Sequence, residues 1–178
     1  PLALFDLCLI PQHDTPPARA NVLATRGALN RIQPSNHLAP DRGLLLIGGP
    51  SAHFGWDHLA LYQQITAVLR ANPTTRWTLT TSRRTPADFL QGLPISTDYP
   101  LEVAPVTATD WDWLPTQLAQ AHQVWVTADS VSMIYEALTA GAAVGVFAIP
   151  PSHPNRLSRG IDQLAEQGWI TPFERWRQ

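Results

Sequence analysis

Short apolar runs that alternate with helical patterns are the feature that most constrains the fold of this chain. Each run has the length of a β-strand. Near-continuously apolar strands separated by helices are typical of a parallel sheet that is covered on both faces. The sequence therefore predicts a Rossmann-like α/β architecture, with strands expected at Leu4–Ile10, Leu44–Ile47, Trp77–Thr80, Val124–Thr127 and Val144–Ala148.

Helical patterns occupy the intervals between these strands. Apolar residues in Leu59–Leu69 recur at helical spacing, and a following proline ends the pattern. Thr85 stands before a proline as a capping residue stands before the first helical position, which predicts a helix start at Pro86–Leu90. Ser130–Ala140 is predicted as another helix, capped by Ser130 and ended by Gly141, where the backbone needs a positive φ.

The composition excludes several classes of function. All 12 basic residues are arginines, so the chain has no lysine for a Schiff base or a P-loop. A formal charge of -2 argues against nucleic acid as a partner. Cys8 is the single cysteine, which excludes an intramolecular disulfide and a multi-cysteine zinc site and fits a reducing compartment. No apolar run approaches the roughly 20 residues of a membrane span, so no transmembrane helix is expected.

The first forty residues differ from the rest of the chain. A single expected strand is followed by a proline-rich polar run without helical periodicity, which is typical of a connector. This order is expected where a chain is cut inside a two-domain protein. We therefore expect residues 1–40 to be the last strand of an N-terminal domain plus a connector, and residues 41–178 to form a Rossmann-like domain.

Two candidate ligand segments follow expected strands, at the sheet edge where parallel α/β sheets bind ligands. Gly48–Gly55 begins with two adjacent glycines that allow the backbone close to an anion, although a plain strand-to-helix turn explains the segment equally well. Ser82–Pro86 places Arg83 and Arg84 where they could hold a diphosphate. Solvated arginines are the commoner outcome for such a pair.

A third segment, Val126–Gly141, joins a buried strand, a polar turn and a helix. Ser130 and Ser132 can present hydroxyl and N–H groups at the positive end of that helix, which favours an anion. Glu136 lies within two turns, where a carboxylate could accept two ribose hydroxyls. The alternatives are a plain N-cap for Ser130 and a solvent-facing side chain for Glu136. A fourth segment, Ile149–Arg156, is a polar loop before the last helix.

In combination, these segments resemble the ELM1-like family, which is named for a plant mitochondrial fission factor and has bacterial members described as glycosyltransferases. The residues that carry the resemblance are Gly48–Ser51, Ser82–Pro86, Thr127–Ala137, Pro11–Asp14 and Thr25–Asn30. It implies the GT-B fold, in which two Rossmann-like domains face one another and the C-terminal one binds a nucleotide sugar. Residues 41–178 would then be the nucleotide-sugar-binding domain, with a nucleotide-diphosphate sugar as substrate and neither a further cofactor nor a metal.

Ser130–Gly141 and Val144–Asn155 are also similar to a region of the undecaprenyl-linked muramyl peptide N-acetylglucosaminyltransferases. By position, this resemblance implies that Glu136 holds the ribose. It also implies that Ser130 and Ser132 hold the diphosphate.

The same resemblance implies that His153 or Asn155 contacts the sugar, and the chain departs from it at Asp129, where that family has small residues. The full set of donor-binding candidates is Gly48, Gly49, Ser51, Ser82, Arg83, Arg84, Thr85, Asp129, Ser130, Ser132, Glu136, His153 and Asn155.

Glycosyl transfer needs a base for the acceptor hydroxyl and positive groups for the departing diphosphate. Arg83, Arg84 and the helix start at Ser130 could serve the second need without a metal. For the base we name His13, with Asp14 orienting its imidazole. The alternative for this pair is local backbone capping in a loop.

Two other functions stay open. One is a non-catalytic adaptor of GT-B shape, with some of the seven tryptophans exposed as a contact patch. The other is a nucleotide-sugar epimerase of GT-B shape, which would need an acid/base pair among His53, His153 and Glu136. The partners expected besides the nucleotide sugar are the missing N-terminal domain and an undetermined acceptor, a membrane-associated one included. A cytoplasmic location is expected, with peripheral attachment to the inner membrane as a variant, and the isolated half is not expected to turn over.

Overall fold

A six-stranded sheet forms the main body of the computed structural model, which describes residues 2–93 and 99–178, except for the side chain of His13. Every pair of neighbouring strands in this sheet is parallel. The strands, in their order across the sheet, are β5 (Leu101–Ala104), β4 (Arg76–Thr81), β3 (Ala39–Ile47), β6 (Ala121–Thr127), β7 (Ala143–Phe147) and β8 (Ile170–Pro172).

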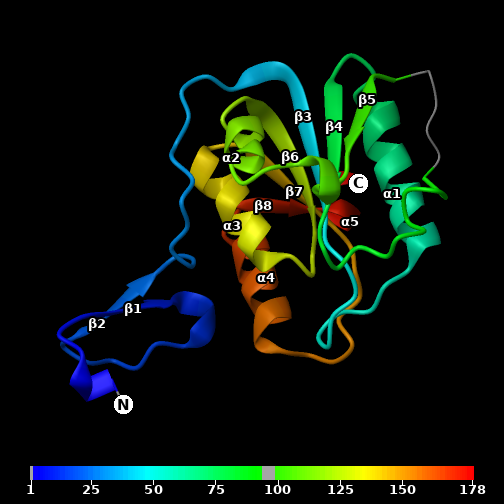
Figure 1. Cartoon of the computed structure of the whole chain (residues 1–178). Coiled ribbons are helices and arrows are strands. Elements are labelled where there is room, and N and C mark those ends of the chain that lie inside the picture. The colour runs from blue at the N-terminus through cyan, green and yellow to red at the C-terminus, as the bar shows by residue number, and fades with distance from the viewer. Residues whose placement is uncertain (1, 94–98) are drawn as a thin grey trace.

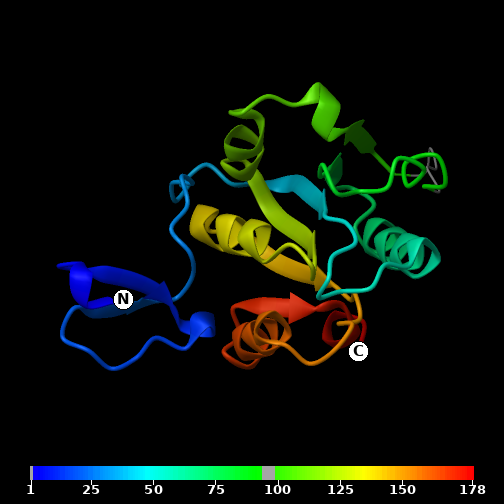
Figure 2. The ribbon, with the colours of Figure 1, turned by 60° about the horizontal axis from the view of Figure 1, so that its bottom comes forward.

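Helices cover both faces of this sheet (Figures 1 and 2). One face carries α1 (His58–Ala71) and α5 (Phe173–Trp176), and the other carries α2 (Trp113–Leu118), α3 (Val131–Ala140) and α4 (Arg156–Glu166). Within the described residues, three short 3-10 turns complete the elements: η1 (Leu2–Leu4), η2 (Gln12–Asp14) and η3 (Val106–Ala108). This arrangement confirms the predicted Rossmann-like α/β class.

The strand order places a topological switch point between β3 and β6. From β3 the chain crosses to β4 and β5 on one side, then returns to β6 and continues outward to β7 and β8 on the other. In doubly wound sheets of this kind, ligands bind in the crevice at the carboxyl ends of the strands where the order reverses. The fold therefore directs attention to the residues that follow β3 and β6.

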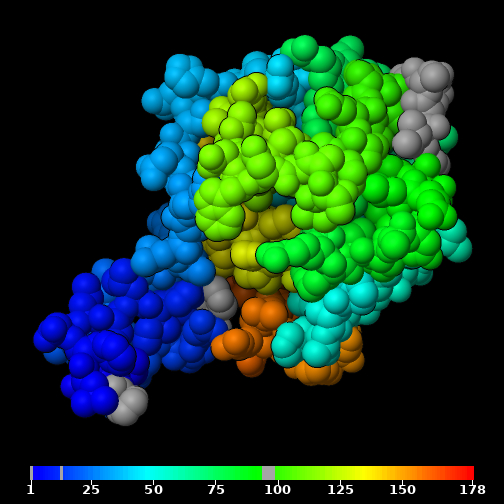
Figure 3. Space-filling model, viewed as in Figure 1, coloured from blue at the N-terminus to red at the C-terminus, as the bar shows by residue number. Residues whose placement is uncertain are grey.

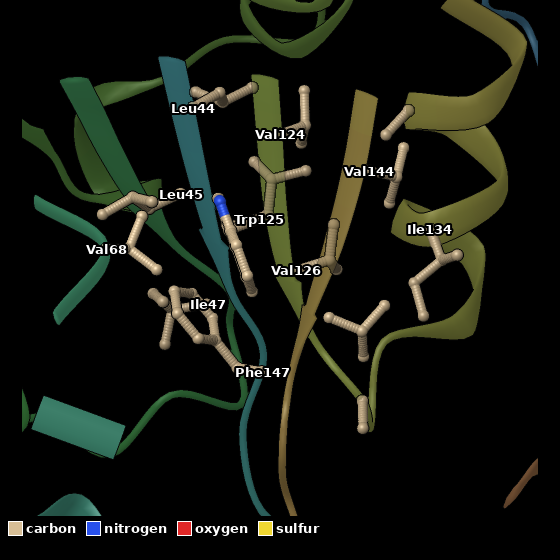
Figure 4. Close-up of a cluster of buried hydrophobic side chains, with 14 of the residues drawn as sticks. Leu44, Leu45, Ile47, Val68, Val124, Trp125, Val126, Ile134, Val144 and Phe147 are labelled. Carbon is tan, nitrogen blue, oxygen red and sulfur yellow. The ribbon is translucent and has the colours of Figure 1, made fainter. Parts of the chain in front are cut away.

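The core consists of side chains that alternate between the two faces of the sheet (Figure 4). Leu45 pairs in register with Trp125, and Val68 of α1 packs on their side, whereas Ile134 of α3 lies on the opposite side. Gly145 follows in the same register, where an added Cβ would lie 2.4 Å from the Trp125 indole. A glycine is needed there because the indole occupies the space of a side chain.

A second, two-stranded parallel sheet lies outside the main body. It pairs β1 (Cys8–Pro11) with β2 (Val22–Thr25) and projects from one side of the molecule (Figures 1 and 3). Its turn η2 packs against α4. Much of the apolar surface in this part of the chain is exposed, on Leu4, Phe5, Leu7, Leu9, Leu23 and Leu29.

The connector between the two sheets runs along α3. The Asn30 side-chain amide donates to the Thr139 hydroxyl at 3.1 Å. The Ser35 N–H donates to the Ala140 carbonyl at 3.0 Å, and the Ser35 hydroxyl donates to the Ala119 carbonyl at 2.6 Å. These bonds fix the connector to the C-terminal end of α3 and to the end of α2.

Three local predictions are wrong. The strand expected at Leu4–Ile10 begins only at Cys8. The expected connector contains the strand β2, and no local sequence pattern predicts its pairing with β1. The expected helix at Pro86–Leu90 is a series of turns, in which the Phe89 N–H donates to the Pro86 carbonyl at 3.0 Å. No helix in the described part of the chain is long and apolar enough to cross a bilayer.

Candidate functional site

Residues that follow three adjacent strands, β4, β3 and β6, meet at the carboxyl edge of the sheet through Arg84. The Arg84 guanidinium donates to the Gly49 carbonyl at 2.7 Å. It also donates to Asp129 Oδ2 at 2.7 Å and to Ser130 Oγ at 3.2 Å. Three segments that are far apart in the sequence are thus linked by one side chain, and the link crosses the switch point between β3 and β6.

The carboxylate of Asp129 is the buried member of this group. Its side chain has 0% exposure, whereas that of Arg84 retains 43%. Oδ2 accepts from the Gly49 N–H at 3.0 Å and from the Ser130 hydroxyl at 3.2 Å, in addition to Arg84. Oδ1 is buried without a hydrogen-bond partner in the described part of the chain.

The two glycines after β3 allow this close approach. A Cβ on Gly48 would lie 2.2 Å from Asp129 Oδ2, and a Cβ on Gly49 would lie 2.2 Å from the carbonyl oxygen of Arg84. The Thr85 hydroxyl donates to the Gly48 carbonyl and accepts from the Ser82 N–H at 2.8 Å. Thr85 therefore fixes the glycine segment to the turn after β4 and caps no helix, contrary to the sequence prediction.

The loops after β3 and β7 form a second group of candidates. Ser51 Oγ accepts from the N–H groups of His53 and Phe54, each at 3.2 Å, which closes the turn. The Asn155 carboxamide accepts from the backbone at the start of α4 and donates to the His153 carbonyl at 2.9 Å. Asn155 is therefore a helix cap, while the exposed rings of His53 and His153 lie 6.0 Å apart, centroid to centroid.

The candidate residues at the start of α3 and those further along the helix have different surroundings. Ser130 occupies the N-cap position, but its hydroxyl makes no capping hydrogen bond, contrary to the sequence prediction, because it is engaged with Asp129. Ser132 is exposed in the first turn, and Glu136 follows four residues later on the same face. Burial raises the pKa of the half-buried Glu136 carboxyl, and the nearby Arg31 guanidinium opposes that shift.

Three further candidates lie apart from the Arg84 group. The Arg83 side chain is exposed and forms no ion pair or hydrogen bond with residues that the structure describes. The His13 side chain lies outside the described residues. Asp14 follows it in η2, and its carboxylate accepts from Arg156, the first residue of α4, at 2.7 Å.

A groove that the sequence did not reveal lies between the N-terminal segment and the helices α3 and α4. Its cavity is about 350 Å³ in volume and is lined by Gln12, Asn30, Tyr135, Gln163, Leu164 and Trp169, among others. Burial raises the pKa of the Tyr135 phenol, and the negative charge of Asp14 adds to the shift. The lining comes from separate segments of the chain. Three of them carry the family resemblance, Pro11–Asp14, Thr25–Asn30 and Thr127–Ala137, but no signal in the sequence places them around one groove.

The structure describes residues 2–93 and 99–178. Among these, no group of three or more His, Cys, Asp or Glu residues is placed so that it could bind a metal ion. The Arg84 group instead offers backbone N–H, hydroxyl and guanidinium donors, which suit an anionic oxygen.

Comparison with known proteins gives one match along the whole sequence. The family model described as Mitochondrial fission ELM1 matches residues 1–178. No curated protein matches the chain significantly.

The solved structures that are similar to this chain share little of its sequence. The KpsC beta Kdo 2,4 transferase of Thermosulfurimonas dismutans is 18% identical, with a TM-score of 0.44 over 68% of this chain. The chain spans only 39% of that KpsC chain. AnUbiX (PadA1), solved with FMN and dimethylallyl pyrophosphate, is 10% identical, with a TM-score of 0.42 over 80% of this chain and 78% of its own. An FMN-dependent UbiX-like decarboxylase from Escherichia coli O157:H7 is 12% identical, with a TM-score of 0.43 over 72% of this chain and 77% of its own.

Proposed function

This chain belongs to the Mitochondrial fission ELM1 family, and we propose that it is the donor-binding half of a glycosyltransferase of the GT-B type. In this proposal, residues 41–178 bind a nucleotide-diphosphate sugar, and residues 1–40 are the end of an N-terminal domain with its connector. The acceptor is an alcohol group of a molecule that the N-terminal domain holds, and a membrane-associated acceptor is compatible with cytoplasmic or peripheral placement.

The single observation that carries the proposal is the convergence on Arg84 at the switch point. Gly49, Arg84 and Ser130 direct an N–H group, a guanidinium and a hydroxyl toward one place beyond the carboxyl ends of β3 and β6, which the Asp129 carboxylate oxygen Oδ2 holds in this structure. Open α/β sheets bind their ligands at this place. Donors of these three kinds are the usual ligands of phosphate oxygens in proteins.

Each remaining candidate takes a role that its position permits. Arg83, exposed and without a partner among the described side chains, and Ser132, in the first turn of α3, are available to the diphosphate. Glu136 receives the ribose hydroxyls on the same helix face as Ser132. His153 contacts the sugar, while Asn155 shapes the loop as the cap of α4.

The proposed chemistry is a substitution at the anomeric carbon. The acceptor oxygen forms the new bond, the bond from the anomeric carbon to the diphosphate oxygen breaks, and the diphosphate leaves with the electron pair. His13 is the proposed base that takes the acceptor proton, and the proposed role of Asp14 is to orient its imidazole. Arg83 and Arg84 stabilise the negative charge on the leaving diphosphate.

The test is a thermal-unfolding screen of the chain against UDP, GDP, CMP and their sugars. One nucleotide series is expected to raise Tm through preferential binding to the folded state. The increase should be lost in an Arg83→Ala, Arg84→Ala double variant and reduced in Glu136→Ala. A matched double variant, Arg42→Ala with Arg76→Ala, removes two arginines that are register partners at the other end of β3 and β4 and should keep the increase. If every nucleotide leaves Tm unchanged, or if both double variants lose the effect equally, the donor site is refuted.

The adaptor function remains a second candidate because of one observation. The N-terminal segment exposes Phe5 at 60% and Leu4 and Leu29 at 77% each, and Trp111 on the main body is 79% exposed. Large apolar side chains that are exposed to this extent are common at interaction surfaces. The two functions separate in the nucleotide screen, because an adaptor requires no nucleotide.

The epimerase alternative rests on the proximity of His53 and His153. It would be favoured if an epimerised nucleotide sugar formed without any acceptor and if His153→Ala abolished it.

A further inference from the structure

Three donors converge on a single oxygen atom at the switch point. Asp129 Oδ2 accepts from the Arg84 guanidinium at 2.7 Å, from the Gly49 N–H at 3.0 Å and from the Ser130 hydroxyl at 3.2 Å. We call these three donors the anion seat. A guanidinium, a backbone N–H and a hydroxyl around one oxygen are the pattern by which proteins hold phosphate oxygens.

The occupant of the anion seat is the chain's own carboxylate. We infer that Asp129 is the residue that decides whether an external phosphate oxygen can enter the seat, because its carboxylate already fills it. The inference rests on the proposed function only in naming a diphosphate as the ligand. The seat itself is a feature of the described residues.

The walls of the seat leave no room for both anions. Gly48 and Gly49 approach so closely that a Cβ on either would lie 2.2 Å from the nearest atom of Asp129 or Arg84. The Asp129 side chain has 0% exposure, so its carboxylate occupies the space and supplies the negative charge. A phosphate oxygen can enter only where that carboxylate has left, since two like charges repel at such distances.

Two features favour exchange of the occupant. Asp129 Oδ1 is buried with no hydrogen-bond partner that the structure describes, which is a costly state for a carboxylate oxygen. Arg84 has 43% of its side chain exposed, so the seat borders solvent through its strongest donor. An external phosphate with several oxygens could satisfy the seat while its other oxygens remain in water.

The experiment measures binding of inorganic pyrophosphate and of UDP to the folded chain by isothermal titration calorimetry. Asp129→Ala empties the seat and is expected to bind pyrophosphate at least about tenfold more tightly than the natural chain, since one charge-assisted contact contributes about that factor. The matched control is Asp41→Ala, which also removes one acidic partner of an arginine, Arg76, but at an exposed ion pair. The control should leave pyrophosphate affinity unchanged.

A second variant guards against loss of folding. Asp129→Asn keeps the size of the side chain and removes its charge, so it should bind pyrophosphate more tightly than Asp41→Asn, by a smaller factor than Asp129→Ala. Adding Arg84→Ala to either Asp129 variant should remove the gain. Thermal unfolding checks each variant. The inference is overturned if the folded Asp129 variants bind no more tightly than the Asp41 controls, or if neither Asp129 variant folds, because the carboxylate is then required by the fold.

The same titrations separate this inference from the proposed function. Binding of a nucleotide by the natural chain without any gain in the Asp129 variants keeps the donor site and refutes the role of Asp129. A gain with pyrophosphate, but no binding of any nucleotide by any variant, keeps the role of Asp129 and refutes the donor site.

Discussion

Substitution of Gly49 by alanine tests the geometry of the candidate site most directly. The new Cβ would lie 2.2 Å from the Arg84 carbonyl oxygen and 2.3 Å from its carbonyl carbon, which are backbone atoms that cannot rotate away. The turn after β4 must therefore move. That movement loosens the bonds from Arg84 to the Gly49 carbonyl and from the Gly49 N–H to Asp129.

The magnitude follows from three terms. Steric overlap in a packed site costs about 1–3 kcal/mol. Two loosened hydrogen bonds add about 1 kcal/mol each. Alanine offsets about 0.4–1 kcal/mol by restricting the unfolded chain. The free energy of unfolding should fall by about 2–5 kcal/mol, which for a chain of this size lowers Tm by about 4–20 °C.

The assay is thermal unfolding followed by circular dichroism, with Gly55→Ala as the control. Gly55 lies in the same loop, its added Cβ would meet no atom closer than 3.6 Å, and its φ is not positive. Gly55→Ala should leave Tm unchanged or raise it slightly. The argument from the close approach of the two turns is refuted if the Tm of Gly49→Ala lies within about 2 °C of the Tm of Gly55→Ala, because that is less than the smallest expected shift.

Three further outcomes are expected. Gln64→Ala should destabilise the chain by about 2–4 kcal/mol in urea unfolding, because the buried Gln64 amide donates to the Ala148 carbonyl and accepts from the Ala148 N–H. The control is Gln63→Ala, at the exposed neighbouring residue, and an equal loss of stability in both variants would contradict this explanation. Asp41→Ala should change stability by no more than about 1 kcal/mol, because both partners of its ion pair are more than half exposed; a larger loss would show that the pair is not a surface contact. Burial raises the folded-state pKa of Glu136, so the folded protein binds that proton more tightly than the unfolded chain, and stability due to this group falls as pH rises from the ordinary pKa of 4.5 through the raised value. Glu136→Gln should therefore be the more stable form at pH 7, with the difference shrinking toward pH 4 in urea unfolding; an unchanged difference across that range would refute the assignment.

The main sheet could be predicted because its signals are local. The strands β3, β6 and β7 are buried on both faces over Leu44–Ile47, Val124–Val126 and Val144–Phe147, and the side chains in these ranges are apolar. Gly141 was identified as a helix end, and it has a φ of 92° there. These features depend on residues close together in the sequence, which is where periodicity and capping rules apply.

The wrong predictions depend on distant partners. Thr85 has the residue type and the following proline of a cap, yet its hydroxyl bonds to Gly48, 37 residues away. The strand β2 forms because it pairs with β1. Its sequence, Val22–Thr25, includes an exposed leucine and is as typical of a loop as of a strand. A local pattern contains no information on such partners.

The candidate site was predicted as separate segments and not as a connected group. The sequence placed Arg84 and Asp129 each after a strand, but their contact requires β4 and β6 to flank β3, and strand order is not a property of any single segment. The roles of His13, Ser132 and His153 stay predictions. The groove beside Tyr135 cannot be predicted from the sequence, because its walls come together only in the folded chain.

The anchoring of the connector has a mechanical consequence. Ser35 and Asn30 fix the connector to the C-terminal end of α3, while the N-terminal end of the same helix begins beside Asp129 and Ser130. A helix of 10 residues is a stiff rod of about 15 Å. A rotation of the N-terminal segment that left the bonds at Thr139 and Ala140 intact would therefore pull on the C-terminal end of this helix. Because the helix is stiff, its opposite end, at the switch point, would then be pulled as well.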